Sequence, residues 1–506
     1  MGWFNNKKFL FNLSIILLIL TFNNVEAVTI ENELPDDILN QLTIEKRSKL
    51  KSLTNLKDKF QNKLYKFDNL DEQIPRDSIQ IVRAEKKPGL ISVQKAVFDV
   101  NYMFKLLKYG YSGYQYFGGD EKFNSVKEDI IKTIKDRDIF NFITTNRFID
   151  IVTTQLSFIQ DLHFSIDNKS VGNRYQYYMS PAYEFRKDEN GLYTNLDKGK
   201  AYLKEIKGSK LEKLIKPALN EKGEIIYRLG AVINNKVGKK VELQVEFQVA
   251  NELINKRIML LKPERKYFKS KTPYNKYKKE GFTIIEHRTA SANEANRDQL
   301  KRLAEEAKEL KDNKYLIIDL RGNAGGADTY ASDWVENFTG VEPGEGIIES
   351  SLVTDTANRL LLNSFNQLYG LSYEELEPEY LKLFEKTESG WTEINYHEYR
   401  VIENKTLIIV LIDNGVASAG ESFVNYLNQM ENVILIGTNT AGLLGFGNMG
   451  MCNLPNSKVQ LSISKTISLP PDLTSREGRG YYPDFWVEPN KALTTAVSFI
   501  NNYFQN

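Results

Sequence analysis

The chain has 506 residues, of which 41% are hydrophobic and 26% are charged. These are ordinary globular values, and they exclude a wholly disordered chain, a collagen and a polytopic membrane protein. The 67 basic and 66 acidic residues nearly balance, so no basic field indicates a nucleic-acid partner. With one cysteine and three histidines, we expect no intramolecular disulfide, no His/Cys metal site and no cofactor. Any catalytic histidine must be His163, His287 or His397.

The first 27 residues are predicted to be a signal peptide. Two lysines precede an apolar run over residues 9–22, and residues 25–27 are similar to a small-residue cleavage site. The run is too short to span a bilayer comfortably, although an uncleaved membrane anchor is the alternative. We therefore expect a secreted or extracytoplasmic protein that begins near Val28 and has no stable membrane insertion after signal removal.

Residues 28–165 are predicted to form an N-terminal helical region. A helical pattern near residues 44–67 lies in a segment that Lys87-Pro88-Gly89 ends, and apolar residues recur at helical spacing from about residue 96 onward, with a break at Gly118-Gly119. A helix is expected over Asn146 to Asp161, with its apolar residues on one face. The chain then passes directly into His163, so one of the three histidines follows an amphipathic helix.

Two further regions follow. Residues 166–270 show strand-like alternation between turn signals, which predicts a small, mostly β module. Residues 271–500 alternate strands with helices, which predicts an α/β domain whose continuous apolar strands are buried on both faces. The strands are expected at Phe282 to Glu286, Tyr315 to Leu320, Thr406 to Ile412 and Val433 to Ile436, and the helices at Asn293 to Leu310, from about Thr329, and at Ser418 to Met430.

A glycine-rich turn follows one of these strands, in the run Asp319-Leu-Arg-Gly-Asn-Ala-Gly-Gly326. Glycines allow backbone N–H groups to approach a ligand without a Cβ in the way, so the turn could hold a phosphate or an oxyanion. It matches neither the dinucleotide fingerprint nor a P-loop. The alternative is a simple tight connection between a strand and a helix.

Ser418 opens a helix after another buried strand. The N–H groups and dipole of a helix start suit a nucleophile that must pass charge to an oxyanion. The alternative is a capping box, because Ser418 and Glu421 have the spacing of that motif. Val416 occupies the position of the first glycine in the G-x-S-x-G elbow, which argues against an α/β esterase.

His163 is the best candidate for a general base. A histidine is the natural base for a serine near neutral pH, although a lone histidine is more often structural. His287 ends a predicted strand, and His397 lies in a polar, aromatic stretch that is typical of a surface.

Four motifs in this order resemble those of the C-terminal processing, or tail-specific, serine peptidases. Asp161-Leu-His163 is similar to the Asp-x-His of the branch without a catalytic lysine, which includes the tricorn protease. The resemblance extends over residues 280 to 490 and, more sparsely, 96 to 265. The four motifs are Asp319-Leu-Arg-Gly-Asn-Ala-Gly-Gly326, Ala417-Ser-Ala-Gly-Glu421, Ile436-Gly-Thr-Asn-Thr-Ala-Gly442 and Glu477-Gly-Arg-Gly-Tyr-Tyr-Pro-Asp484.

The resemblance implies an architecture. The catalytic domain, residues 271–500, would have the crotonase-like α/β fold of tail-specific proteases. The N-terminal helical region would precede it, and residues 166–270 would be a degenerate PDZ-like module. We find no carboxylate-binding loop of the Gly-Leu-Gly-Phe type in that module.

The resemblance also implies roles for individual residues. Ser418 would be the nucleophile and His163 the base and leaving-group acid. Glu477 would orient the histidine, with Asp161 as the alternative orienter. The oxyanion donors would be the backbone N–H groups of Gly325 or Gly326 and of Ala419.

The lysine of the lysine-dependent members has no counterpart, because Leu443 follows Gly442. The nearest lysines, Lys458 and Lys465, lie in an alternating stretch, for which we predict a solvated strand face. The sequence thus favours a secreted serine endopeptidase that cleaves protein or peptide substrates through an acyl-enzyme on Ser418. The alternative is a catalytically inactive relative that binds apolar ligands or peptides.

Overall fold

The computed structural model describes residues 39–44, 55–79, 86–136, 141–264, 268 and 272–505. The predicted signal peptide, residues 1–27, and Val28 lie outside the described residues. Within the described part, no helix is both long enough and apolar enough to cross a membrane.

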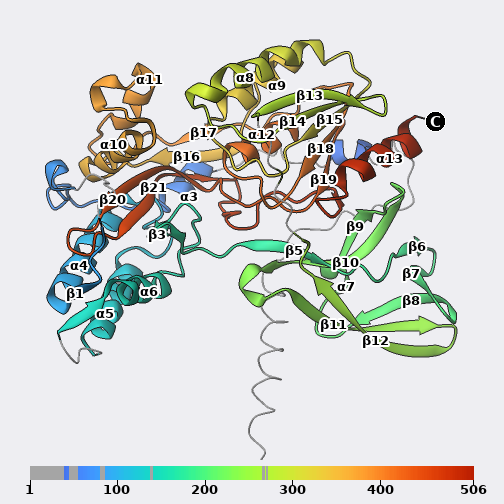
Figure 1. The fold of residues 1–506 in the computed structure, drawn as a ribbon, viewed down its shortest axis with the longest axis horizontal. Helices are drawn as coiled ribbons and strands as arrows, with labels where there is room; N and C mark the ends of the chain where they lie inside the picture. Colours follow the sequence, from blue (N-terminus) through green and yellow to red (C-terminus); the bar gives the residue numbers. More distant parts are fainter. Residues whose placement is uncertain are drawn as a thin grey trace, which may run out of the picture.

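The N-terminal region is mostly helical (Figure 1), and α4, α5 and α6 share one apolar core, whereas α3 packs in another. The side-chain oxygens of Ser92 and Thr144 accept backbone N–H groups at the starts of α4 and α6, which satisfies amides left open by the helix ends. The elements are α3 (Leu56–Gln61), η1 (Arg76–Ser78), β1 (Leu90–Ser92), α4 (Val93–Gly110), α5 (Gly119–Lys135), β2 (Phe142–Thr144) and α6 (Thr145–Gln155).

Helix α6 ends at Gln155, so the predicted extension of this helix to Asp161 is wrong. The Asp161 carboxylate accepts the backbone N–H groups of His163 and Phe164 at 2.8 and 3.2 Å. This local bonding favours a turn over a helix. His163 is therefore held in a loop between α6 and the next strand.

The α/β part is built on a parallel run of strands in the order β14-β15-β18-β19-β22, with β13 antiparallel at the edge. Every residue of β18 is buried, because α8, α9 and α12 cover one face of the sheet and α13 covers the other (Figure 1). The predicted strands and helices of this part are found. Their bounds are β13 (Tyr274–Lys279), β14 (Phe282–His287), α8 (Glu294–Glu305), η3 (Glu306–Glu309), β15 (Tyr315–Asp319), α9 (Thr329–Thr339), β18 (Leu407–Ile412), α12 (Ala419–Leu427), β19 (Val433–Gly437), β22 (Phe485–Trp486) and α13 (Ala492–Phe504).

A mostly β segment continues this sheet. Ala218 in β9 pairs with Trp486 in β22, which joins the two parts edge to edge. Its strands enclose an apolar core of their own. The PDZ-like assignment of residues 166–270 stays a prediction. The elements are β5 (Tyr175–Met179), β6 (Arg186–Asp188), β7 (Gly191–Leu196), β8 (Gly199–Ile206), α7 (Leu211–Leu214), β9 (Ile215–Leu219), β10 (Ile225–Asn234), η2 (Asn235–Val237), β11 (Lys240–Val249) and β12 (Glu252–Leu261).

A second sheet brings the loop of His163 to the α/β part. Ser165 and Ile166 form β3, which pairs with Ser462 and Leu461 of the long strand β21. The other elements of this layer are β4 (Lys169–Ser170), β16 (Ile347–Ser351), α10 (Asp355–Tyr369), η4 (Tyr373–Glu375), α11 (Pro378–Leu381), η5 (Lys382–Phe384), β17 (Asn395–His397), β20 (Phe446–Asn453) and β21 (Gln460–Leu469). The pairing fixes His163 near a domain that is distant in sequence.

Candidate active site

Ser418 is held in a strained backbone conformation at the start of α12. Its φ is 49° and its ψ is −126°, a region that non-glycine residues rarely adopt and that is often found at functional sites. Its side chain makes no capping hydrogen bond. The carboxylate of Glu421 accepts the hydroxyl of Thr440 and the N–H groups of Gly442 and Leu443. The hydroxyl of Ser418 is therefore not used as a helix cap.

The glycine-rich turn lies against Ser418, and no side chain fits between them. A Cβ on Gly325 would come within 2.9 Å of the Cβ of Ser418 and 3.0 Å of the Ala419 nitrogen. A Cβ on Gly326 would lie 2.1 Å from the backbone of Ala290. The φ angles of the two glycines, 101° and 145°, are also in the region that favours glycine. Glycine is required at positions 325 and 326 because the turn packs closely against the backbone near Ala419 and near Ala290.

The hydrogen bonds of this turn show which of its two candidate oxyanion donors, the N–H of Gly325 or that of Gly326, is available. The N–H of Gly325 donates to Oδ1 of Asn323 at 3.0 Å, and its carbonyl oxygen accepts the N–H of Ala290 at 3.1 Å. In a trans peptide the C=O and N–H point in opposite directions, so the N–H of Gly326 points away from Ala290. Within the described residues we find no hydrogen-bond acceptor for the N–H of Gly326 or of Ala419.

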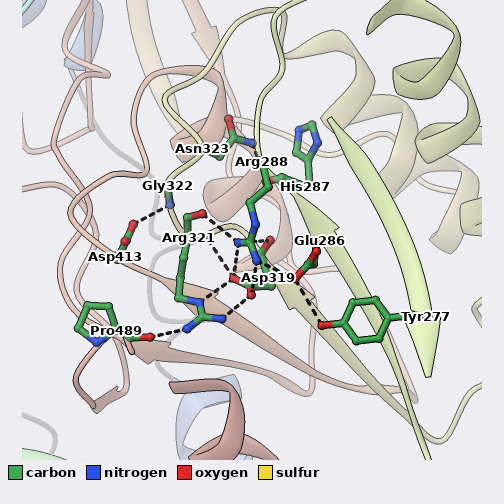
Figure 2. Close-up of polar contacts among 10 residues, drawn as sticks. All are labelled: Tyr277, Glu286, His287, Arg288, Asp319, Arg321, Gly322, Asn323, Asp413 and Pro489. Atoms are coloured by element: carbon green, nitrogen blue, oxygen red, sulfur yellow. Dashed lines mark hydrogen bonds and ion pairs between the residues drawn. The ribbon is translucent and has the colours of Figure 1, made fainter. Parts of the chain in front are cut away.

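A buried ion-pair cluster lies beneath the turn (Figure 2). Asp319 accepts hydrogen bonds from Arg288 at 2.7 Å and from Nε of Arg321 at 2.8 Å. Burial acts to raise the pKa of Asp319, but the hydrogen bonds from the two arginines hold it at about 2. The charged form of Asp319 therefore persists throughout the neutral range and fixes the end of β15.

His163 lies close to one buried carboxylate. Its Nδ1 is 4.0 Å from Oδ1 of Asp161, and it has no hydrogen-bond partner among the described residues. The other oxygen of Asp161 accepts the hydroxyl of Ser464 at 2.9 Å. Burial lowers the pKa of His163, and the charge of Asp161 opposes this shift. The imidazole is thus neutral at pH 7, as a general base must be.

Glu477 holds the backbone beside His163. Its carboxylate accepts the N–H of Leu162 at 3.0 Å and the N–H of Gly445 at 2.8 Å. Burial, and then the charge of Asp161, raises the pKa of Glu477 well above its usual range. In the described structure no hydrogen bond joins Glu477 to the imidazole ring.

Ser418 and His163 line one cavity of about 750 Å³, although they are 255 residues apart in the chain (418 − 163). Gly326, Ala419 and Leu443 line the same cavity. The structure therefore brings together the predicted nucleophile, the predicted base and two predicted amide donors. Asp161 lies beside the imidazole of His163, and Glu477 contacts the backbone of the neighbouring Leu162.

Sequence reasoning missed the far wall of this cavity. Its residues belong to no motif, so no local pattern signalled them. Glu349, one of them, accepts the hydroxyl of Ser468 at 2.9 Å and lies 3.3 Å from Nε2 of His397. His397 is thus half-buried against the cavity wall. The missed residues include Glu345, Glu349, Leu361, Phe365, Leu368, Tyr399 and Tyr426.

His287 has a structural role. Its Nδ1 lies 3.2 Å from the carbonyl oxygen of Pro273. Burial lowers its pKa to about 4. It does not line the cavity of Ser418.

The prediction of a solvated strand face is wrong for Lys465. Lys465 is 1% exposed, and its Nζ donates to the side chain of Asn358 at 2.7 Å and to the carbonyl oxygen of Leu383. Burial lowers its pKa to about 7. Helix α10 covers this side of β21, which an alternating pattern alone cannot reveal. Lys458 lies in the turn before β21, and neither lysine lines the cavity.

Comparisons with known proteins find similarity to one peptidase family. Residues 292–487 match the sequence model of peptidase family S41. No curated protein matches the chain. Among solved structures, mature CPAF is 14% identical, with 81% of this chain and 96% of that chain covered and a TM-score of 0.41. A peptidase from Parabacteroides merdae is 13% identical, with coverages of 82% and 97% and a TM-score of 0.40. The tricorn protease is 13% identical, with coverages of 79% and 35% and a TM-score of 0.33.

Proposed function

We propose that this chain is a serine endopeptidase that uses Ser418 as its nucleophile, and the match of residues 292–487 to the sequence model of peptidase family S41 supports this proposal. One observation carries this proposal. The strained Ser418, whose hydroxyl caps no helix, lines one cavity with Gly326 and His163, and among the described residues no other histidine lines it. We further propose that the catalytic part has a crotonase-like fold and belongs to the branch without a catalytic lysine.

The chemistry follows from the positions of these groups. The Ser418 hydroxyl attacks the peptide carbonyl carbon while His163 accepts its proton. Nδ1 of His163 is on the side of Asp161, which leaves Nε2 for the serine proton. The N–H groups of Gly326 and Ala419 stabilise the oxyanion, and the start of α12 adds its dipole. His163 then protonates the leaving amine, and water hydrolyses the acyl-enzyme.

Direct labelling tests the proposal. The purified protein should hydrolyse an unfolded protein substrate and react with a fluorophosphonate probe. Mass spectrometry of the digested adduct should place the probe on Ser418. A labelled residue elsewhere, or hydrolysis without labelling, would contradict the assignment.

The two buried carboxylates divide the supporting roles. Asp161 is the acid nearest to the imidazole, so we propose that it orients and stabilises His163 as an imidazolium. Glu477 was the orienter expected from the family resemblance, and we assign it the positioning of the His163 loop through Leu162 and Gly445. Two carboxylates this close and this buried do not both ionise readily, which favours a proton on Glu477.

Matched amide variants should separate these roles. Asp161→Asn is expected to lower kcat by about 10³- to 10⁴-fold, because it removes the charge that stabilises the imidazolium. Glu477→Gln is expected to cost less activity, because a carboxamide keeps one acceptor oxygen for the two N–H groups. Steady-state kinetics and Tm measured on both variants check the order. The reverse order would return the orienting role to Glu477.

An inactive relative that binds apolar ligands or peptides remains the second candidate. One observation favours it: the C-terminal end of α10 brings an apolar surface to the cavity, with Leu368 55% exposed. An inactive protein would bind peptides without reacting with the fluorophosphonate. Labelling of Ser418 therefore separates the two functions.

Export is the remaining part of the proposal. The cationic start and short apolar run of residues 1–27 favour removal by a signal peptidase. We expect the mature protein to be found outside the cytoplasm with an N-terminus near Val28. N-terminal sequencing of exported protein checks this, and an intact Met1 would favour a membrane anchor instead.

A further inference from the structure

We propose that Asn323 is the positioning residue of the oxyanion hole. Its side chain fixes the peptide between Ala324 and Gly325, which withdraws the N–H of Gly325 and leaves the N–H of Gly326 as the donor for the substrate. This inference rests on the proposed serine peptidase function. It concerns a residue that touches neither substrate nor reacting atoms.

Both polar atoms of the Asn323 side chain form hydrogen bonds with backbone groups. The residue is fully buried. Its Oδ1 accepts the N–H of Gly325 at 3.0 Å, and its Nδ2 donates to the carbonyl oxygen of His287 at 3.2 Å. Figure 2 shows Asn323 beside His287, at the end of β14 and above the cluster of Asp319. The amide is thus anchored to a rigid strand while it holds the turn.

This hydrogen bond selects the oxyanion donor. Oδ1 of Asn323 occupies the N–H of Gly325, so that group is withdrawn from substrate binding. The carbonyl oxygen of Gly325 accepts Ala290 on the other side of the turn. Together the two bonds fix both peptide planes around Gly325, and the N–H of Gly326 is the group left free.

Asn323 also joins the turn to the nucleophile loop. Its carbonyl oxygen accepts the N–H of Ala417 at 2.9 Å. A Cβ on Gly420 would lie 2.5 Å from that same oxygen, so the start of α12 packs directly on Asn323. One residue therefore sets the distance between the two oxyanion donors, Gly326 and Ala419.

The need for such a residue follows from the glycines. Two successive glycines can rotate into many backbone conformations at low cost. Without the side chain of Asn323, the peptide before Gly325 loses this hydrogen bond, and only the bond from Ala290 restrains the peptide after Gly325. An oxyanion donor contributes only when it is fixed before the reaction, since reorientation during the reaction removes its advantage.

Three variants in the full-length protein test the role. Asn323→Ala removes both side-chain bonds. Asn323→Ser removes the bond to His287 but keeps an oxygen that can accept an N–H two residues later in the chain. Asn404→Ala is the matched control, because Oδ1 of Asn404 accepts the N–H of Thr406 at 3.0 Å and its Nδ2 donates to Glu431 at 2.8 Å. Asn404 precedes β18, whereas Ser418 follows the other end of that strand.

Kinetics and binding then give different readouts. For Asn323→Ala we expect kcat to fall by about 10²- to 10³-fold, as for the loss of an oxyanion donor, with little change in KM. The affinity for a peptide boronate, which forms a tetrahedral adduct on the serine, should fall by the same factor. Peptide binding to Ser418→Ala should not change when Asn323→Ala is added. Asn323→Ser should recover part of kcat, and Asn404→Ala should keep all of it.

Some results would overturn the role. A folded Asn323→Ala with less than about a threefold loss of kcat would do so, as would equal losses in Asn323→Ser and Asn323→Ala. Should Asn323→Ala fail to fold, Asn323→Ser alone carries the test, and its boronate affinity must fall in step with kcat. A wild-type protein without hydrolysis or labelling would instead overturn the proposed function, so the two failures are distinguishable.

Discussion

Replacement of Ser418 by alanine is expected to abolish peptide hydrolysis, with a fall in kcat of about 10⁶-fold, and to abolish fluorophosphonate labelling. Loss of a nucleophile removes the covalent route altogether. The fold should not suffer, because the hydroxyl makes no capping bond. A lost cap would cost about 1 kcal/mol, so an unchanged Tm is part of the prediction.

Ser422 offers a matched control. It lies one turn later in α12 and lines the same cavity. Ser422→Ala should keep both hydrolysis and labelling, because the glycine turn packs against Ser418, which this variant retains. Normal labelling of Ser418→Ala, or loss of labelling in Ser422→Ala, would contradict the nucleophile assignment.

The α/β part could be predicted from sequence because its strands are uniformly apolar. Residues 315–320 and 406–412 lack the alternation of a one-faced strand, which indicates burial on both sides. The structure confirms it, since helices cover both faces of β15 and β18. The turn at the end of β15 could also be predicted from local sequence. Its glycines at positions 325 and 326 adopt positive φ, which other residues rarely do.

Long-range contacts could not be predicted in this way. Lys465 alternates with apolar residues along β21, and nothing local shows that α10 covers it. Helix α6 ends at Gln155 although apolar residues continue at helical spacing to Ile159, so the apolar periodicity does not show where the helix stops. The role of Asn323 depends on Gly325 and His287 together, and His287 is 36 residues away. The far wall of the cavity carries no motif at all.

Replacement of His163 by alanine is expected to cost nearly as much activity as Ser418→Ala, and the double variant should be little worse than either. A serine hydroxyl is a weak nucleophile without its base, so the two residues act as one unit. His397→Ala is the control, because His397 is half-buried and contacts Glu349, a residue that lines the same cavity. It should retain hydrolysis.

The pH dependence gives an independent signature of this base. Only the neutral imidazole accepts the proton, so kcat/KM should rise with pH through one ionisation and then level off. Burial lowers the pKa of His163 below its usual 6.5, so the midpoint of the rise should lie below that value. His397→Ala should leave this midpoint in place.

Lysine variants test the alternative base, because a lysine-dependent mechanism predicts that a lysine variant, and not His163→Ala, loses activity. A lysine base must lose its proton through desolvation, and Lys465 has the lowered pKa, about 7, that such a base would need. Its amine, however, is bound to Asn358 and Leu383 and does not line the cavity of Ser418. Lys465→Met and Lys458→Ala should therefore keep kcat and the pH midpoint, although Lys465→Met can lower Tm. A dead Lys465→Met that is still folded, together with an active His163→Ala, would assign the proton transfer to lysine.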